Sequence, residues 1–203
     1  MNYRGSGVVE GINAIRQQIV GEDPFNVERL WEKIYRQGGT HPSLSGVEMA
    51  LWDIIGKALK TPIYNLLGGR CRDKIRVYVD GFFRGAAYKP EEYAQAAVET
   101  VKEGFTALKM DIDGPLPSIH TMDRSISRAD LHYTLSMVEA VRSAIGDNVE
   151  LAVDLHGSFN TTTAIMLAKK LEKYDLMWIE DPIPSGNAAA MAKVAEVVET
   201  PIC

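Results

Sequence analysis

Cysteine is scarce in this 203-residue sequence, which contains only Cys71 and Cys203. Two cysteines are too few for a disulfide framework and do not have the spacing of a metal-binding motif, so they fit a reducing compartment. The N-terminal segment also lacks an apolar run long enough for a signal peptide or a membrane span. We therefore expect a cytoplasmic protein with no membrane partner.

Concentrated positive charge is missing too. The sequence has 22 lysines and arginines against 27 aspartates and glutamates, a net charge of -5, and no basic patch interleaved with aromatic residues. This pattern argues against nucleic acid as a partner. The hydrophobic content of 46% and charged content of 24% are typical of a globular chain of one or two domains.

The N-terminal third shows apolar residues at helical spacing. This periodicity predicts amphipathic helices over residues 8–20 and 27–35. A third helix is expected to begin at Ser45, which has capping-box spacing to Glu48, and to end before Pro62.

The rest of the sequence alternates between short strands and helices. Runs typical of strands occupy residues 75–79, 105–110, 149–154, 176–180 and 201–203. Helical patterns lie between them, over residues 90–104, 128–146, 162–174 and 188–199. Repetition of strand, helix and strand predicts a parallel sheet with right-handed crossovers.

A doubly wound sheet and a barrel both satisfy this alternation. The barrel is favoured because no glycine-rich phosphate loop follows the first strand, and because polar residues recur where strands end. A closed barrel needs eight strands and about 250 residues, whereas residues 71–203 supply four strands and the start of a fifth. We therefore predict an α/β chain, with helices in residues 1–70 and the N-terminal half of a TIM-like barrel in residues 71–203.

Two carboxylates close successive predicted strands. Asp154 and Glu180 are one strand-and-helix unit apart, so a barrel would make them neighbours at its C-terminal mouth. Carboxylates that close repel each other unless a proton or a cation intervenes, and a hard cation such as Mg²⁺ prefers oxygen ligands. His156 would point to the same side as Asp154, because side chains of a strand alternate with period two. Lys109, at an earlier strand end, would join them.

Each of these residues also has an ordinary structural explanation. Asp154 or Glu180 alone could cap the following helix or form a surface pair, and His156 alone could be a satisfied polar residue. Lys109 could extend its aliphatic part along the rim. Their occurrence together at corresponding strand ends favours a functional site.

Five segments of the sequence resemble those of a known protein family. The resemblance rests on "GVEMALWDIIGKALKTPIYNLLGG", "RDKIRVYVDG", "GFTALKMD", "VDLHG" and "MWIEDPIP". These segments are similar to the mandelate racemase and muconate lactonizing enzyme branch of the enolase superfamily. The resemblance implies a modified (β/α)₇β barrel, truncated here at its fifth strand. It also implies that residues 1–70 are the helical part of an α+β capping domain whose three-stranded sheet is absent.

The resemblance also implies a set of metal ligands. The family holds Mg²⁺ with acids that end the third, fourth and fifth barrel strands, and Asp154 and Glu180 match the first two. The third acid would follow Cys203, in a Gly-Glu pair. The family's racemases and lactonizing enzymes use a Lys-x-Lys pair at the second strand, but Lys109-Met110-Asp111 lacks the second lysine.

The segment Asp154-Leu155-His156 instead resembles the Asp-x-His of galactonate- and mannonate-type sugar-acid dehydratases. The resemblance makes His156 the general acid for the departing hydroxyl and Lys109 a group that neutralises the enediolate. We expect a Mg²⁺-dependent, homo-oligomeric dehydratase that converts a sugar acid, an aldonate such as galactonate, gluconate or mannonate, into a 2-keto-3-deoxy acid. An insertion over residues 111–130 would line the pocket or contact another subunit. The alternatives are an epimerase or racemase of the same superfamily, or a non-catalytic fragment or binding protein without Mg²⁺ affinity.

Overall fold

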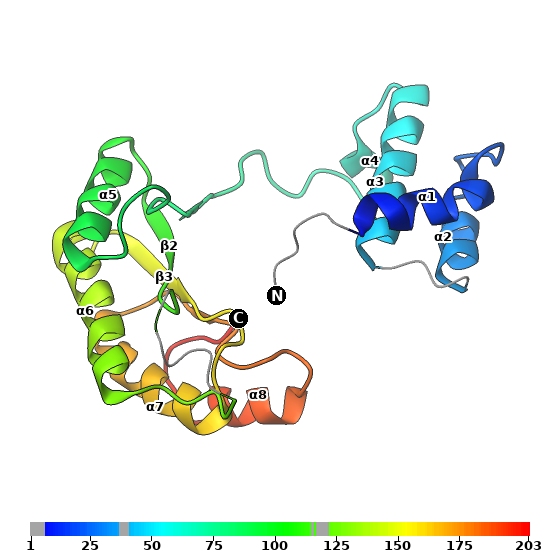
Figure 1. Cartoon of the computed structure of the whole chain (residues 1–203). Helices are drawn as coiled ribbons and strands as arrows, with labels where there is room; N and C mark the ends of the chain where they lie inside the picture. Colours follow the sequence, from blue (N-terminus) through cyan, green and yellow to red (C-terminus); the bar gives the residue numbers. More distant parts are fainter. Residues whose placement is uncertain (1–6, 37–40, 115, 117–121) are drawn as a thin grey trace. The chain divides into compact units, whose positions relative to one another are not determined.

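The computed structural model describes residues 7–36, 41–114, 116 and 122–203. The chain divides into two compact units, Met1–Ile75 and Arg76–Cys203 (Figure 1). Within the described ranges, no helix is both long and apolar enough to cross a membrane.

The first unit is built from helices. They are α1 (Val8–Ile19), α2 (Val27–Arg36), α3 (His41–Ala58) and the single turn α4 (Ile63–Leu66). The first two follow the predicted amphipathic segments closely. Their apolar faces meet α3 in two small clusters: Leu30 lies with Leu51 and Ile55 in one, and Ile15 with Ile34 in the other. Burial of these faces, more than helix propensity, stabilises such short helices.

The start of α3 corrects one prediction. The helix begins at residue 41 rather than at Ser45, which lies inside it and is not its N-cap. Pro42 is the second residue of the helix, where the missing backbone N–H has no intrahelical partner to lose. Ser43 and Leu44 are buried at 0% and 2% exposure, so packing holds the extra turn against the rest of the unit.

The second unit alternates strands and helices as predicted. The strands are β1 (Val79–Asp80), β2 (Ala107–Asp111), β3 (Glu150–Asp154) and β4 (Ile179–Glu180). The helices are α5 (Pro90–Lys102), α6 (Arg128–Ile145), α7 (Thr161–Leu171), the 3₁₀ turn η2 (Glu172–Tyr174) and α8 (Ala188–Ala195). All four strands are parallel in the order β1-β2-β3-β4, and Ile202 adds a parallel bridge to Ile179. Figure 1 shows α5, α6, α7 and α8 following one another in an arc along the strands.

The outer strands are shorter than the sequence predicts. The run 75–79 contributes only Val79 to β1, because pairing with β2 is limited to Val79 and Asp80. Ile75 and Val77 remain 76% and 57% exposed. The segment thus has a high β propensity, but among the described residues no strand pairs with most of its length.

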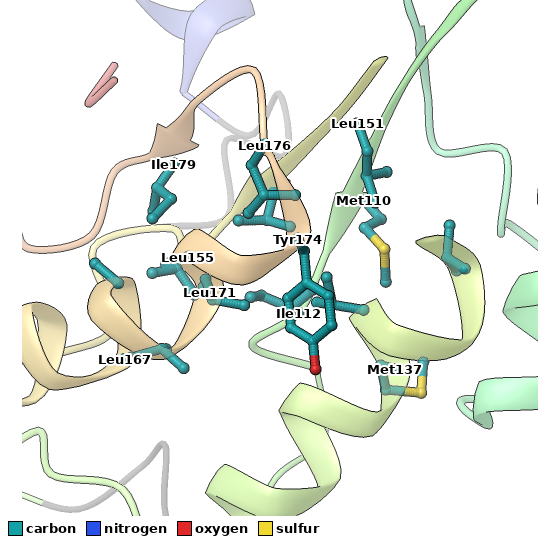
Figure 2. Packing of buried hydrophobic residues seen from close by; sticks show 14 of the residues in the cluster. Met110, Ile112, Met137, Leu151, Leu155, Leu167, Leu171, Tyr174, Leu176 and Ile179 are labelled. Carbon is teal, nitrogen blue, oxygen red and sulfur yellow. The ribbon is translucent and has the colours of Figure 1, made fainter. Parts of the chain in front are cut away.

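The central strands separate their side chains cleanly between two faces. Leu108 and Met110 of β2, with Leu151 and Val153 of β3, are fully buried in the main hydrophobic cluster. Figure 2 shows part of this cluster, including Met110, Leu151 and Met137 of α6. The intervening residues face the opposite side of the sheet, because the period of a strand is two. The polar residues of that face form the candidate site.

A buried arginine binds the segments that lead into two strands of the sheet. Arg142, near the end of α6, donates to four backbone carbonyls at distances of 2.7–3.0 Å. The acceptors precede β3 and β4 in the sequence: Gly146, Val149, Tyr174 and Asp175. Burial lowers the pKa of Arg142 from its ordinary value, against the charges of Asp147 and Asp175.

Candidate active site

Acidic residues form a row across the end of the sheet. The strand register pairs Asp111 of β2 with Asp154 of β3, and Asp154 with Glu180 of β4. Residues in register on parallel strands project to the same face, so these three carboxylates share the face that is turned away from the helices. Lys109 lies two residues before Asp111 and therefore projects to that face as well.

Lys109 lies between two of these acids. Its ammonium group is 2.6 Å from Asp154 Oδ2 and 3.2 Å from Glu180 Oε2, and its side chain is only 6% exposed. Burial acts to lower the pKa of Lys109, but the hydrogen bonds and charges of the two carboxylates outweigh it and raise the pKa. The lysine is thus held as a cation at this end of the sheet.

Asp154 also organises the turn that follows its strand. Its Oδ1 accepts a hydrogen bond from the backbone N–H of His156 at 2.9 Å. His156 has a φ of 46°, in the left-handed region that few residues other than glycine, asparagine, aspartate and histidine adopt. Gly157 follows with a φ of 65°, and a Cβ there would lie 3.2 Å from the backbone of Pro184. The turn is tight and closely packed, so the position of the imidazole is set by the backbone.

The ring of His156 faces a group of carboxylates. Its Nδ1 is 3.0 Å from Asp113 Oδ1 and 3.7 Å from Asp154 Oδ1, while its Nε2 is 4.0 Å from Asp111 Oδ1. Burial alone would lower the pKa of His156, but the nearby carboxylates, Asp113 first among them, raise it. The side chain stays 48% exposed, so it is open to a ligand.

Part of the predicted insertion packs on this turn. Arg124 donates to the carbonyl of Gly157 at 2.5 Å, and the side chain of Asn160 donates to the carbonyl of Asp123 at 2.7 Å. Residues 115 and 117–121 of the insertion lie outside the described residues. The described part of the insertion therefore contacts the turn that carries His156.

The donor chemistry of the row suits a hard cation. Ligand atoms of Asp111, Asp154 and His156 all lie within 4.8 Å of one another. Asp154 and Glu180 already share one cation, the ammonium of Lys109. Carboxylate oxygens are the ligands that Mg²⁺ takes, and Asp154 and Glu180, with Asp111 paired to Asp154, supply them from adjacent strands.

The structure brings together the four residues singled out from the sequence. Lys109 contacts Asp154 and Glu180, and the backbone of His156 contacts Asp154.

Asp111, one of the polar residues at the predicted strand ends, joins the row of acids. Two further polar residues of the site were not predicted: Asp113, which lies against His156, and Ser158, which donates to Asp113 Oδ2 at 2.6 Å. The signal for Asp113 was the period of two that runs from Lys109 through Asp111 to Asp113.

Comparison with known proteins identifies the family. Residues 92–203 match the model described as enolase C-terminal domain-like, and residues 6–68 match the mandelate racemase/muconate lactonizing enzyme N-terminal domain. The chain belongs to the mandelate racemase/muconate lactonizing enzyme family of the enolase superfamily. The family expected from the sequence is thereby confirmed.

Solved members of this superfamily share the fold. One from Salmonella Typhimurium has a TM-score of 0.86 at 30% identity, covering 100% of this chain and 57% of that one. A mandelate racemase/muconate lactonizing enzyme-like protein from Rubrobacter xylanophilus has a TM-score of 0.84 at 37% identity, covering 97% and 56%. The predicted fold class, a partial enolase-type barrel after a helical segment, is confirmed.

Curated relatives in the same superfamily are sugar-acid dehydratases. The D-xylonate dehydratase of Haloferax volcanii is 36% identical over 98% of this chain and 51% of its own length. The D-gluconate dehydratase of Thermoproteus tenax is 34% identical over 87% of this chain and 35% of its own length. The chain thus spans about half, or less, of the length of these relatives.

Proposed function

We propose that this chain supplies the metal-binding half of a Mg²⁺-dependent sugar-acid dehydratase. The substrate would be an aldonate such as gluconate or galactonate, and the product a 2-keto-3-deoxy acid. The observation that carries the proposal is that Asp154 binds both the ammonium group of Lys109, at 2.6 Å, and the backbone N–H of His156, at 2.9 Å, so that the imidazole is held 3.7 Å from the same carboxylate. The relatives named as dehydratases support it.

The first chemical problem is to remove a proton next to a carboxylate. Loss of that proton produces an enediolate, whose negative charge must be stabilised. Mg²⁺ held by Asp154 and Glu180 would supply Lewis-acid stabilisation of that charge. Lys109 contributes a fixed positive charge beside the same two acids, and burial strengthens its effect because water does not screen it.

The second problem is the departure of the hydroxyl group on the neighbouring carbon. A hydroxide leaves readily only if it receives a proton as its bond to carbon breaks. His156 suits this role because its side chain reaches solvent at the strand ends, and because nearby carboxylates raise its pKa and so keep the proton available. Water would be the product of this transfer.

Asp111 favours dehydration over racemisation. It lies two residues after Lys109, where the racemases and lactonizing enzymes of this family carry a second lysine as a base. Burial raises the pKa of Asp111, whose carboxylate lies 4.0 Å from Nε2 of His156. The described site therefore contains a proton donor and a fixed cation, without a second lysine.

The test is a screen of aldonates for 2-keto-3-deoxy products with and without Mg²⁺. It would use this chain and a form extended at both ends to the length of the relatives. We expect product only when Mg²⁺ is present, and a loss of about 10²–10⁴ in turnover for His156→Asn. Asparagine is the matched replacement because it tolerates a positive φ and leaves the turn intact.

Two results would overturn the proposal. Unchanged dehydration by His156→Asn would remove the histidine from the reaction. Exchange of the α-proton with solvent, without loss of water from any aldonate, would instead assign the extended protein to the epimerases.

A further inference from the structure

The strand pairing continues past the last residue of β2. The N–H of Ile112 donates to the carbonyl of Asp154 at 3.2 Å, and Ile112 is fully buried on the helix side. The next residue, Asp113, therefore returns to the face of Lys109 and Asp111. Extending the register by one step of two places Asp113 beside His156, as Asp111 lies beside Asp154.

Asp113 is the only carboxylate within hydrogen-bond distance of the His156 ring among the described residues. Its Oδ1 is 3.0 Å from Nδ1, whereas the oxygens of Asp154 and Asp111 are 3.7 Å and 4.0 Å from the ring nitrogens. An ionised carboxylate accepts hydrogen bonds and donates none, so Nδ1 must carry its hydrogen toward Asp113. Nε2 is then the nitrogen left to face a ligand.

Asp113 is itself fixed. Its second oxygen, Oδ2, accepts a hydrogen bond of 2.6 Å from Ser158 Oγ, and its side chain is 10% exposed. Ser158 comes from the same turn as His156, and its N–H donates to the carbonyl of Leu155. The carboxylate is therefore held at both oxygens by the segment that carries the histidine.

We propose that Asp113, anchored by Ser158, is a positioning residue that orients the His156 ring with Nδ1 bound and Nε2 directed to the substrate. The inference rests on the proposed function, in which His156 gives a proton to the leaving hydroxyl. Asp113 would act through His156 and would touch neither the substrate nor the metal. The partner of a catalytic histidine thus comes from the loop after β2, and the histidine from the loop after β3.

The first measurement is the tautomer of His156 in the chain itself. Nitrogen NMR of ¹⁵N-histidine-labelled protein would be recorded at a pH where the imidazole is neutral, with the signal assigned by its loss in His156→Asn. In the native chain we expect the hydrogen on Nδ1. In Asp113→Ala and Ser158→Ala we expect a shift toward the Nε2–H form, which predominates for free histidine in water.

Matched variants separate positioning from general damage. Asp113→Asn keeps the shape of the side chain and decides the matter if Asp113→Ala fails to fold, since its amide can donate to Nδ1 and so reverse the tautomer. Asp147→Asn, on the exposed turn before β3, removes the same charge far from the ring and should leave the His156 signals unchanged. Native His156 signals in Asp113→Asn and Ser158→Ala would overturn the proposal.

The second measurement is the kinetic split in the extended enzyme. Asp113→Asn should lower kcat by about 10²-fold or more with KM changed little, because the fault lies in proton transfer rather than in binding. An equal fall in kcat for Asp147→Asn would contradict a positioning role. A tautomer that depends on Asp113, in a protein that dehydrates no aldonate, would refute the proposed function and leave the positioning intact.

Discussion

The two ends of β3 carry the same kind of side chain in opposite surroundings. Glu150 at the start is 46% exposed and pairs with Arg76, which is 58% exposed. Asp154 at the end is 7% exposed and pairs with Lys109, which is 6% exposed. An exposed ion pair contributes little to stability, and a buried pair must offset a large desolvation penalty. The buried charges at the strand end are therefore best explained by chemistry, whereas those at the start need no such explanation.

The largest loss of stability should come from a core residue of β3 that lies between the two ends of the strand. Leu151 is fully buried at the centre of the main cluster. Leu151→Ala should lower the free energy of unfolding by about 3–5 kcal/mol, because it removes apolar contacts and leaves a cavity. Chemical denaturation measures the loss, and Leu151→Met, which keeps the volume, should cost less than about 1.5 kcal/mol. Equal losses in the two variants would contradict this account.

Breaking the buried pair should have the next largest effect. Lys109→Met leaves Asp154 and Glu180 close together without their shared cation, so we expect a loss of about 3 kcal/mol without added metal. Denaturation at low salt and neutral pH is the measurement. Adding Asp154→Asn to Lys109→Met should recover part of the loss, since it removes the uncompensated charge. A Lys109→Met protein as stable as the native chain would show that the pair is solvated.

A smaller effect is expected just beyond the functional end, where α7 begins. Asn160 caps this helix by accepting from the N–H of Thr163 at 2.9 Å. Asn160→Ala should cost about 1 kcal/mol. Asn187→Ala, which removes the corresponding cap of α8, is the control. If Asn160→Ala lowers the free energy of unfolding much more than Asn187→Ala does, the difference measures the additional hydrogen bond that Asn160 donates to the carbonyl of Asp123.

The smallest effect belongs to the start of the strand. Glu150→Gln removes the exposed pair with Arg76, and we expect the free energy of unfolding to change by no more than about 0.5 kcal/mol. The change should shrink further as salt is added, because exposed charges are screened. If Glu150→Gln destabilised the chain as much as Lys109→Met, the contrast between the two ends would fail.

Periodicity was sufficient to predict the order of the elements and the residues at the strand ends. Asp154 and Glu180 were found because a parallel sheet brings successive strand ends to one edge, whatever the details of packing. The start of α3 was predicted four residues too late, because the capping-box spacing at Ser45 carries no information on the burial of Ser43 and Leu44.

The finer contacts of the site depend on register, which a single sequence does not specify. Asp111 meets Asp154, and Asp113 meets His156, only if β2 and β3 pair as they do. A shift of one residue would send both aspartates into the apolar layer. The left-handed turn at His156 also follows from contacts with Asp154 and with the segment at Pro184, which lie outside the local pattern.

The guanidinium of Arg142 has a consequence for how the second unit opens. It binds the carbonyls of two segments, 146–149 and 174–175, that enter neighbouring strands. Neither segment can swing away without leaving a buried charge with too few acceptors. The amides at the entrances to β3 and β4 should therefore exchange with solvent as one cooperative unit.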